Sequence, residues 1–163
     1  MQTELITSKN PSSLKDFFLH KKAHFESKGK HIDWETKKQI WLASIEKLYN
    51  NINNWLAPSV EEQLIEVIYE KAMLSEDYIG SYSVKNMIIQ TGFERVLLKP
   101  KGMIIMGSAG RVDLIGETGT VWLLLLDKKT QYDWQIAVRT ERNKSWPLTE
   151  ESFTDALKWV MQE

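Results

Sequence analysis

Residues 111–126 decide the fold of this chain, and they read RVDLIGETGTVWLLLL. In the first five residues Val112 and Leu114 alternate with Arg111 and Asp113, which predicts a half-buried strand. The Gly-Glu-Thr-Gly of residues 116–119 predicts a hairpin turn. Residues 121–126 are apolar without interruption, which is typical of a central strand covered on both faces. We therefore expect an antiparallel hairpin at this point of the chain.

Similar short strands precede and follow this hairpin. Strands are predicted at residues 64–69, 83–90, 94–98, 103–106, 111–115, 121–126 and 134–139. The connections between them are short: a polar segment at 75–80, a turn at 100–102 and a glycine-containing break at 107–110. Strands joined by such short connections must be antiparallel, because parallel pairs need long crossovers. The glycines of residues 107–119 are assigned to turns, where they permit positive φ.

Apolar residues at helical spacing occur before and after the predicted strands. A first helix opens at residues 11–13 and ends at Gly29, and a second follows Asp33 and ends at Pro58, because proline disfavours the helical conformation of the residue before it. A third helix opens at Pro147 and Thr149. The apolar faces are Leu14, Phe17, Phe18 and Phe25 in the first helix, Trp34, Trp41, Ile45, Leu48, Tyr49, Ile52, Trp55 and Leu56 in the second, and Phe153, Ala156, Leu157, Val160 and Met161 in the third.

The element order predicts an α+β fold: two N-terminal helices, an antiparallel meander sheet of about six or seven strands, and one C-terminal helix packed on the sheet. A length of 163 residues suits a single domain. Within it we expect a loose N-terminus at residues 1–10, a helical segment at 11–57, an antiparallel sheet at 58–141 and the C-terminal helix at 147–162.

Composition and charge exclude several classes of protein. The apolar share of 42% and the charged share of 26% exclude a disordered or collagen-like chain. The chain has no cysteine, which excludes disulfides, thiol nucleophiles and cysteine-ligated metals. The longest apolar run is six residues and no leader is visible, so we expect a cytoplasmic protein without a membrane anchor.

The charge is unevenly distributed along the chain. Residues 1–50 hold nine lysines and six acids, a net charge of +3, whereas residues 51–163 hold 12 basic and 16 acidic residues, a net charge of −4. A nucleic-acid-binding face would carry more positive charge than this, so nucleic acid is an unfavoured partner. The sequence leaves the oligomeric state open.

One candidate catalytic motif joins the two strands of the hairpin. Asp113 lies on the first strand, and Asp127 and Lys129 follow the second. An acid followed by an acid-x-Lys resembles the PD-(D/E)xK nuclease pattern. The resemblance implies that the two carboxylates hold Mg²⁺ and that the lysine helps to activate water for phosphodiester cleavage.

The hairpin register bears on this alternative. If the turn is centred between Glu117 and Thr118, Asp113 lies opposite Trp122. Asp127 is then five residues further along, or about 17 Å at ~3.4 Å per residue. Because five is odd, Asp127 points to the opposite face. The alternative interpretation of residues 127–129 is the polar tip of the next hairpin.

The histidines offer a second, weaker candidate site. His20 and His24 are four residues apart on the first predicted helix, so their side chains are neighbours that could clamp a metal ion. His31 could add a third ligand. Two ligands on one helix make a weak site, and two partly exposed histidines beside Phe17 are the plainer interpretation.

The tryptophans point to a binding surface. Three of the seven lie on the apolar face of the second predicted helix, which favours packing in the core. In the last third of the chain, tryptophan and arginine gather within 26 residues. Exposed tryptophan and arginine are common in the centres of protein interfaces. The predicted partner-binding edge comprises Trp134, Arg139, Arg142, Trp146 and Trp159.

These observations favour binding over catalysis. We predict a non-enzymatic protein-binding module of a bacterial type, such as an adaptor, a regulator or an immunity-like protein, with another protein as its partner and no cofactor. The first alternative is a Mg²⁺-dependent nuclease that uses Asp113, Asp127 and Lys129. The second is a small-ligand carrier with a pocket between sheet and helices, lined by tryptophan and methionine.

Overall fold

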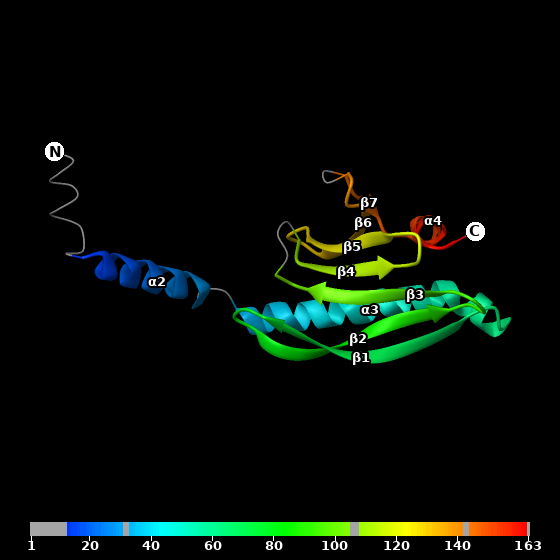
Figure 1. Cartoon of the computed structure of the whole chain (residues 1–163), viewed down its shortest axis with the longest axis horizontal. Helices are drawn as coiled ribbons and strands as arrows, with labels where there is room; N and C mark the ends of the chain where they lie inside the picture. Colours follow the sequence, from blue (N-terminus) through cyan, green and yellow to red (C-terminus); the bar gives the residue numbers. More distant parts are fainter. Residues whose placement is uncertain (1–12, 31–32, 105–107, 142–143, 163) are drawn as a thin grey trace. The chain divides into compact units, whose positions relative to one another are not determined.

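A seven-stranded antiparallel sheet follows the N-terminal helices and precedes a C-terminal helix, which confirms the predicted α+β class (Figure 1). The computed structural model describes residues 13–30, 33–104, 108–141 and 144–162, and within the first range the side chains of residues 13–23. The chain divides into two units, residues 1–34 and residues 35–163.

The first unit contains helix α2 (Leu14–Lys30). Leu14, Phe17 and Phe18 are exposed on it. The helix continues through Gly29, which corrects the prediction that it ends there. Glycine weakens a helix through its backbone entropy but blocks neither the helical dihedrals nor the hydrogen bond, so it does not by itself end one.

The sheet of the second unit is a meander in which every strand pairs with its neighbours in the chain. Its strands are β1 (Glu66–Glu76), β2 (Gly80–Gln90), β3 (Arg95–Gly102), β4 (Gly110–Ile115), β5 (Thr120–Asp127), β6 (Tyr132–Ala137) and β7 (Trp146–Pro147). All six pairings are antiparallel. In the β4–β5 hairpin Asp113 pairs with Trp122, as predicted.

The strand boundaries differ from the prediction, most clearly in the first half of the sheet. β1 and β2 form a longer two-stranded ribbon that includes much of the segment assigned to a connection. β3 continues through Pro100 to Gly102, where the pairing with β4 shifts register; a bulge accommodates a proline that cannot donate a ladder hydrogen bond. Met103 and Ile104 lie outside the strands, and the remainder of that predicted strand lies outside the described residues.

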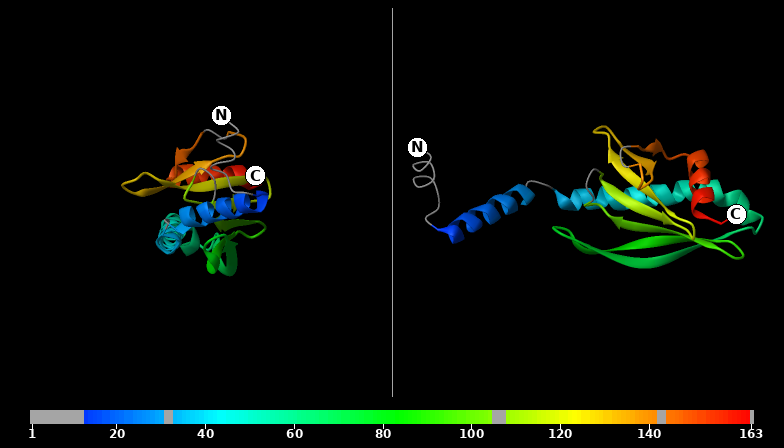
Figure 2. Two further views of the ribbon diagram at one scale, coloured as in Figure 1. Left: turned by 90° about the vertical axis from the view of Figure 1, so that its left-hand side faces the viewer. Right: turned by 45° about the horizontal axis from the view of Figure 1, so that its top comes forward.

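Helix α3 (Trp34–Glu61) supplies the helical side of the core. The sheet curves around it, with β1 and β2 on one side of the helix and β4 to β7 on the other (Figures 1 and 2). The helix buries most of the predicted face, with Trp34 and Trp55 half-buried, and the facing strand residues are almost inaccessible. The buried helix residues are Trp41, Ile45, Leu48, Tyr49, Ile52 and Leu56, and the most buried strand residues include Met87, Val96, Leu98, Leu114, Leu123 and Leu125.

The end of α3 corrects a prediction. The helix continues for a turn beyond Ala57, with Pro58 inside it. Proline disfavours the helical conformation of the preceding residue without forbidding it, and the burial of Leu56 holds the helix in place. The helix ends where Gln63 adopts a φ of 60° and Leu64 N–H donates to the Ser59 carbonyl at 2.9 Å. This six-to-one bond is typical of a left-handed helix stop, formed here without glycine.

The inner strand β5, predicted as a central strand, is covered on one face only. Val121, Leu123 and Leu125 are buried, whereas the alternate residues Trp122 and Leu124 are half-buried. Both helices of this unit lie on the Leu123 side, because Trp134, which shares that face, donates to the α3 carbonyl of Ser44, and the α3 ring of Trp55 contacts the α4 ring of Phe153. The prediction of cover on both faces was therefore wrong.

Two glycines allow close packing rather than a special turn conformation. A Cβ atom on Gly110 would lie 2.3 Å from Cζ3 of Trp41, and one on Gly116 would lie 2.2 Å from the Val160 carbonyl oxygen. Neither glycine is among the described residues with positive φ. Their absence of a side chain lets α3 and the C-terminal helix approach the sheet, which corrects the assignment of these glycines to positive-φ turns.

Helix α4 (Glu150–Val160) buries Phe153, Ala156 and Val160 of its predicted face, whereas Leu157 and Met161 are half-buried. The N-cap is Thr149, whose hydroxyl accepts from Ser152 N–H at 3.1 Å. Pro147, predicted to open this helix, belongs to β7 instead. The backbone therefore pairs with β6 before the helix begins.

Candidate functional site

A groove between the last strands and α4 brings two of the predicted tryptophans together. Trp146 comes from β7 and Trp159 from α4, and together they line a hollow of about 350 Å³. Its other lining residues are Val121, Ile136, Val138, Ser152, Asp155 and Ala156. We call this surface the Trp146–Trp159 groove. Its floor is mostly apolar and its two indole rings are large and accessible.

Hydrogen bonds fix the backbone at Trp159, while its ring stays accessible. The Thr118 hydroxyl in the β4–β5 turn donates to the Trp159 carbonyl at 2.7 Å, and Thr118 N–H donates to the Val160 carbonyl at 3.0 Å. The indole lies against Gly119, where a Cβ atom would come within 2.7 Å of the ring. The side chain nevertheless remains 54% exposed. A fixed but accessible aromatic ring loses little entropy on binding.

Trp146 is positioned by the strand pairing. It pairs with Ile136 of β6, and the following residues are tied down by Leu148 N–H, which donates to the Trp134 carbonyl at 3.1 Å. The Ser145 hydroxyl donates to Gln135 Oε1 at 3.2 Å on the other side. The Trp146 side chain is 43% exposed. The groove is therefore built on a strand and a helix rather than on a free loop.

The rim of the groove on α4 is acidic. Asp155 lines both the groove and an adjoining hollow that also includes Glu150 and Glu151. Lys158 is the one basic residue lining that adjoining hollow. Acidic groups in the first turn of a helix also favour the helix itself, through its dipole. An occupant with an apolar side chain next to a basic group matches this surface.

The other predicted edge residues lie elsewhere. The Trp134 ring packs against Trp41, with centroids 6.1 Å apart, and its Nε1–H donates to the Ser44 carbonyl at 3.1 Å. It therefore contributes to the packing of α3 against β6 and lies outside the groove. Arg139 is exposed just after β6. Arg142 lies outside the described residues.

Asp113 belongs to a compact charge cluster on the sheet face opposite the helices. Arg111 donates to its carboxylate through Nε at 2.8 Å, and the guanidinium lies over the Trp122 ring, 4.8 Å from the centroid. Burial raises the pKa of Asp113, while Arg111, Lys101 and Lys99 act in the opposite direction. Asp113 as a whole is 7% exposed, and its carboxylate is already paired with Arg111. A structural ion pair accounts for this geometry.

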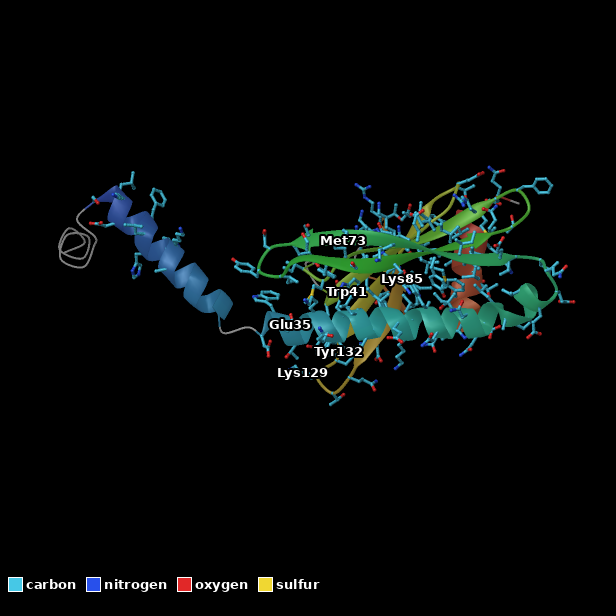
Figure 3. All side chains as sticks on the ribbon, turned by 90° about the horizontal axis from the view of Figure 1, so that it is seen from below. Glu35, Trp41, Met73, Lys85, Lys129 and Tyr132 are labelled. Carbon is cyan, nitrogen blue, oxygen red and sulfur yellow. The ribbon has the colours of Figure 1, made fainter. Side chains whose placement is uncertain are left out.

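The structure does not bring Asp113 and Asp127 together. Asp113 pairs with Trp122, and Asp127 pairs with Tyr132 at the far end of β5. Five residues along the strand separate Asp127 from Trp122, which is about 17 Å, and the odd spacing turns the two carboxylates to opposite faces. Asp127 accepts from Lys129 N–H at 2.8 Å at the exposed tip of the β5–β6 hairpin (Figure 3).

No cluster of three or more histidine, aspartate or glutamate side chains suited to a metal is present among the described residues. His20 is exposed on α2. The side chain of His24, and the whole of His31, lie outside the described residues. The metal-clamp hypothesis therefore stays a prediction.

A second hollow, of about 490 Å³, lies between α3 and the β1–β2 ribbon. We call it the α3–ribbon groove. The Tyr49 hydroxyl at its base donates to the Lys85 carbonyl at 2.6 Å, and burial together with Tyr69 raises the pKa of Tyr49. This groove is lined mainly by tyrosine, lysine and aliphatic residues, whereas a hollow of about 340 Å³ between α3 and the last strands is lined by Trp55 and Trp134. The carrier interpretation, with a pocket lined by tryptophan and methionine, stays a prediction.

Comparison with known proteins identified no relative of this chain. No protein-family model, curated protein or solved structure matches the chain. Across the ranges that the structure describes, no helix combines the length and apolar character needed to cross a membrane.

Proposed function

We propose that this protein is a binding module that docks a protein partner in the Trp146–Trp159 groove, in the manner of an adaptor, a regulator or an immunity-like protein. The observation that carries the proposal is the meeting of two half-exposed indoles over one apolar floor. Tryptophan is strongly enriched among the residues that dominate binding energy at protein interfaces.

The groove also favours one chemistry of partner. Its floor includes Val121, Ile136 and Ala156, which suit an apolar anchor side chain. The acidic residues on α4 suit a basic group beside that anchor, because complementary charge steers association and fixes register. The partner is therefore a protein that presents an apolar side chain flanked by lysine or arginine.

The test is site-specific photo-crosslinking in the cells that make the protein. A benzophenone amino acid replaces Trp159 in one variant and Met73 in the control, since Met73 is also exposed but lies on β1, at the other end of the sheet order. We expect one discrete crosslinked protein from position 159 and none of that mass from position 73.

Purified components complete the test. With the crosslinked partner, the W146A/W159A variant should bind at least about tenfold more weakly than the wild type, since each truncated interface tryptophan costs ~1–2 kcal/mol or more. The M73A variant should bind as the wild type does. Equal binding by W146A/W159A, or no partner-specific crosslink at position 159, would refute the proposal.

A further inference from the structure

We infer that the α3–ribbon groove is a second, separate site, which binds a small organic anion with a flat apolar body. Lys71 and Lys85 are direct cross-strand partners in the β1–β2 ribbon, and both line the groove. Figure 3 shows Lys85 on the side of the ribbon that faces α3.

The two lysines are the first element of the argument. Like charges directly opposite each other on one sheet face repel, and this costs stability. Within the described part of the chain, neither ammonium group lies within 4 Å of a carboxylate, and the Lys85 ammonium lies over the Tyr69 ring at 5.9 Å. An anionic group placed between the two lysines would remove the repulsion. The pair therefore selects a negatively charged ligand.

The aromatic lining of the groove indicates the shape of the rest of the ligand. Tyr69 is 42% exposed and its ring lies 6.0 Å from that of Tyr49, while Ile45 of α3 is a buried residue that also lines the groove. Aromatic side chains bind a flat apolar group by stacking against it. The Tyr69 hydroxyl accepts from Asn53 Nδ2 at 2.6 Å, so this ring is held in place before a ligand arrives.

Size and charge balance complete the description. The volume of about 490 Å³ lies within the ~300–1,000 Å³ typical of small-molecule sites. Glu46 lines the groove from α3 and opposes an anion, so the lining carries a net charge of about +1. A single carboxylate or sulfonate on one or two rings fits this balance better than a multiply charged phosphate compound does.

The test compares two probes that share a ring system. Anilinonaphthalene sulfonate carries one negative charge, and N-phenylnaphthylamine carries none. Both become fluorescent in apolar sites, so titration of the purified protein gives the two affinities directly. We expect the K71Q/K85Q variant to bind the anionic probe about tenfold more weakly, the effect of losing two partly exposed charge pairs. The neutral probe should bind K71Q/K85Q as it binds the wild type.

Three further variants locate the effect. E46Q removes the opposing charge and should strengthen binding of the anionic probe by about two- to fivefold. K128Q, at the β5–β6 hairpin tip, and W146A/W159A should leave the affinity unchanged. Unchanged binding of the anionic probe by K71Q/K85Q, or an equal loss for the neutral probe, would overturn the inference. Loss of probe binding in W146A/W159A alone would move the site to the Trp146–Trp159 groove and overturn it as well.

Discussion

Replacing Gly110 by alanine places a methyl group inside the contact radius of a buried indole. The new Cβ would lie 2.3 Å from Cζ3 and 2.4 Å from Cε3 of Trp41, where contacts of 3.4–4 Å are ordinary. Trp41 is fully buried, and its Nε1–H donates to the Tyr82 hydroxyl at 3.0 Å. The ring therefore cannot move without loss elsewhere.

The cost has two parts. Overpacking a well-packed core costs ~1–3 kcal/mol. If the indole shifts and leaves its N–H buried without a partner, a further ~1–3 kcal/mol is lost. We expect G110A to lower the free energy of unfolding by about 3 kcal/mol. With a urea m value of ~2 kcal/mol per M, the unfolding midpoint falls by about 1.5 M.

The assay is urea unfolding followed by far-UV circular dichroism, with two comparisons. A Cβ atom added to Gly92 would have nothing within 4 Å, so G92A should change stability by less than about 1 kcal/mol, in the stabilising direction. The W41F substitution removes the six-membered ring of the indole, which contains Cζ3 and Cε3. In that background G110A should therefore lower the free energy of unfolding by less than about 1 kcal/mol. Equal costs for G110A in both backgrounds would refute the close-approach reasoning.

Three other predictions follow from named contacts. Y82F removes the acceptor of the buried Trp41 N–H and should cost ~1–3 kcal/mol in urea unfolding, whereas Y69F, at an exposed bond from Asn53, should cost under about 1 kcal/mol. T149A removes the α4 N-cap and should cost ~1 kcal/mol, whereas T154A in the same helix should cost under about 0.5 kcal/mol. Burial raises the folded-state pKa of Asp113, so the unfolded chain loses this proton at a lower pH than the folded protein does. The contribution of Asp113 to the free energy of unfolding is therefore greatest below the unfolded-state pKa of ~3.9 and falls as the pH rises to the folded-state pKa. The unfolding free energy of D113N minus that of the wild type should therefore increase between about pH 4 and pH 7, and a flat difference would contradict the shift.

Local patterns predict much of the fold because they act over a few residues. The spacing of Phe153, Ala156 and Val160 is enough to place the buried face of α4, and a four-residue turn is enough to set Asp113 opposite Trp122. Both results depend on neighbours in the chain. The α+β class follows from the same local information, because short turns between strands leave only antiparallel pairing.

The predictions fail where distant residues decide the structure. Proximity in the chain groups Trp134 with Trp146. In the structure, however, Trp134 Nε1–H donates to the carbonyl of Ser44 in α3, 90 residues away, so its ring packs against α3 and lies outside the groove. The role of Gly110 depends on Trp41 in the same way. No spacing rule connects positions that far apart, so a single sequence could not have predicted either contact.

The two grooves were accessible to prediction to different degrees. Trp146 and Trp159 are close in the chain, one just before the predicted C-terminal helix and the other near its end, so their association could be expected. Lys71 and Lys85 become cross-strand partners only through the length and register of the β1–β2 ribbon, part of which the sequence pattern assigns to a connection. With the ribbon register known, the like-charge pair would have been a visible signal.

The position of both grooves follows from the architecture. In a meander every inner strand is hydrogen-bonded on both edges, and here α3 covers one face, so the inner strands bury their apolar side chains. Toward the two edges of the sheet, side chains are left half-exposed beside a helix. The α3–ribbon groove uses β1 and its partner β2, and the Trp146–Trp159 groove uses β5, β6, β7 and α4. Since the two grooves share no lining residue, occupation of one should leave the affinity of the other unchanged.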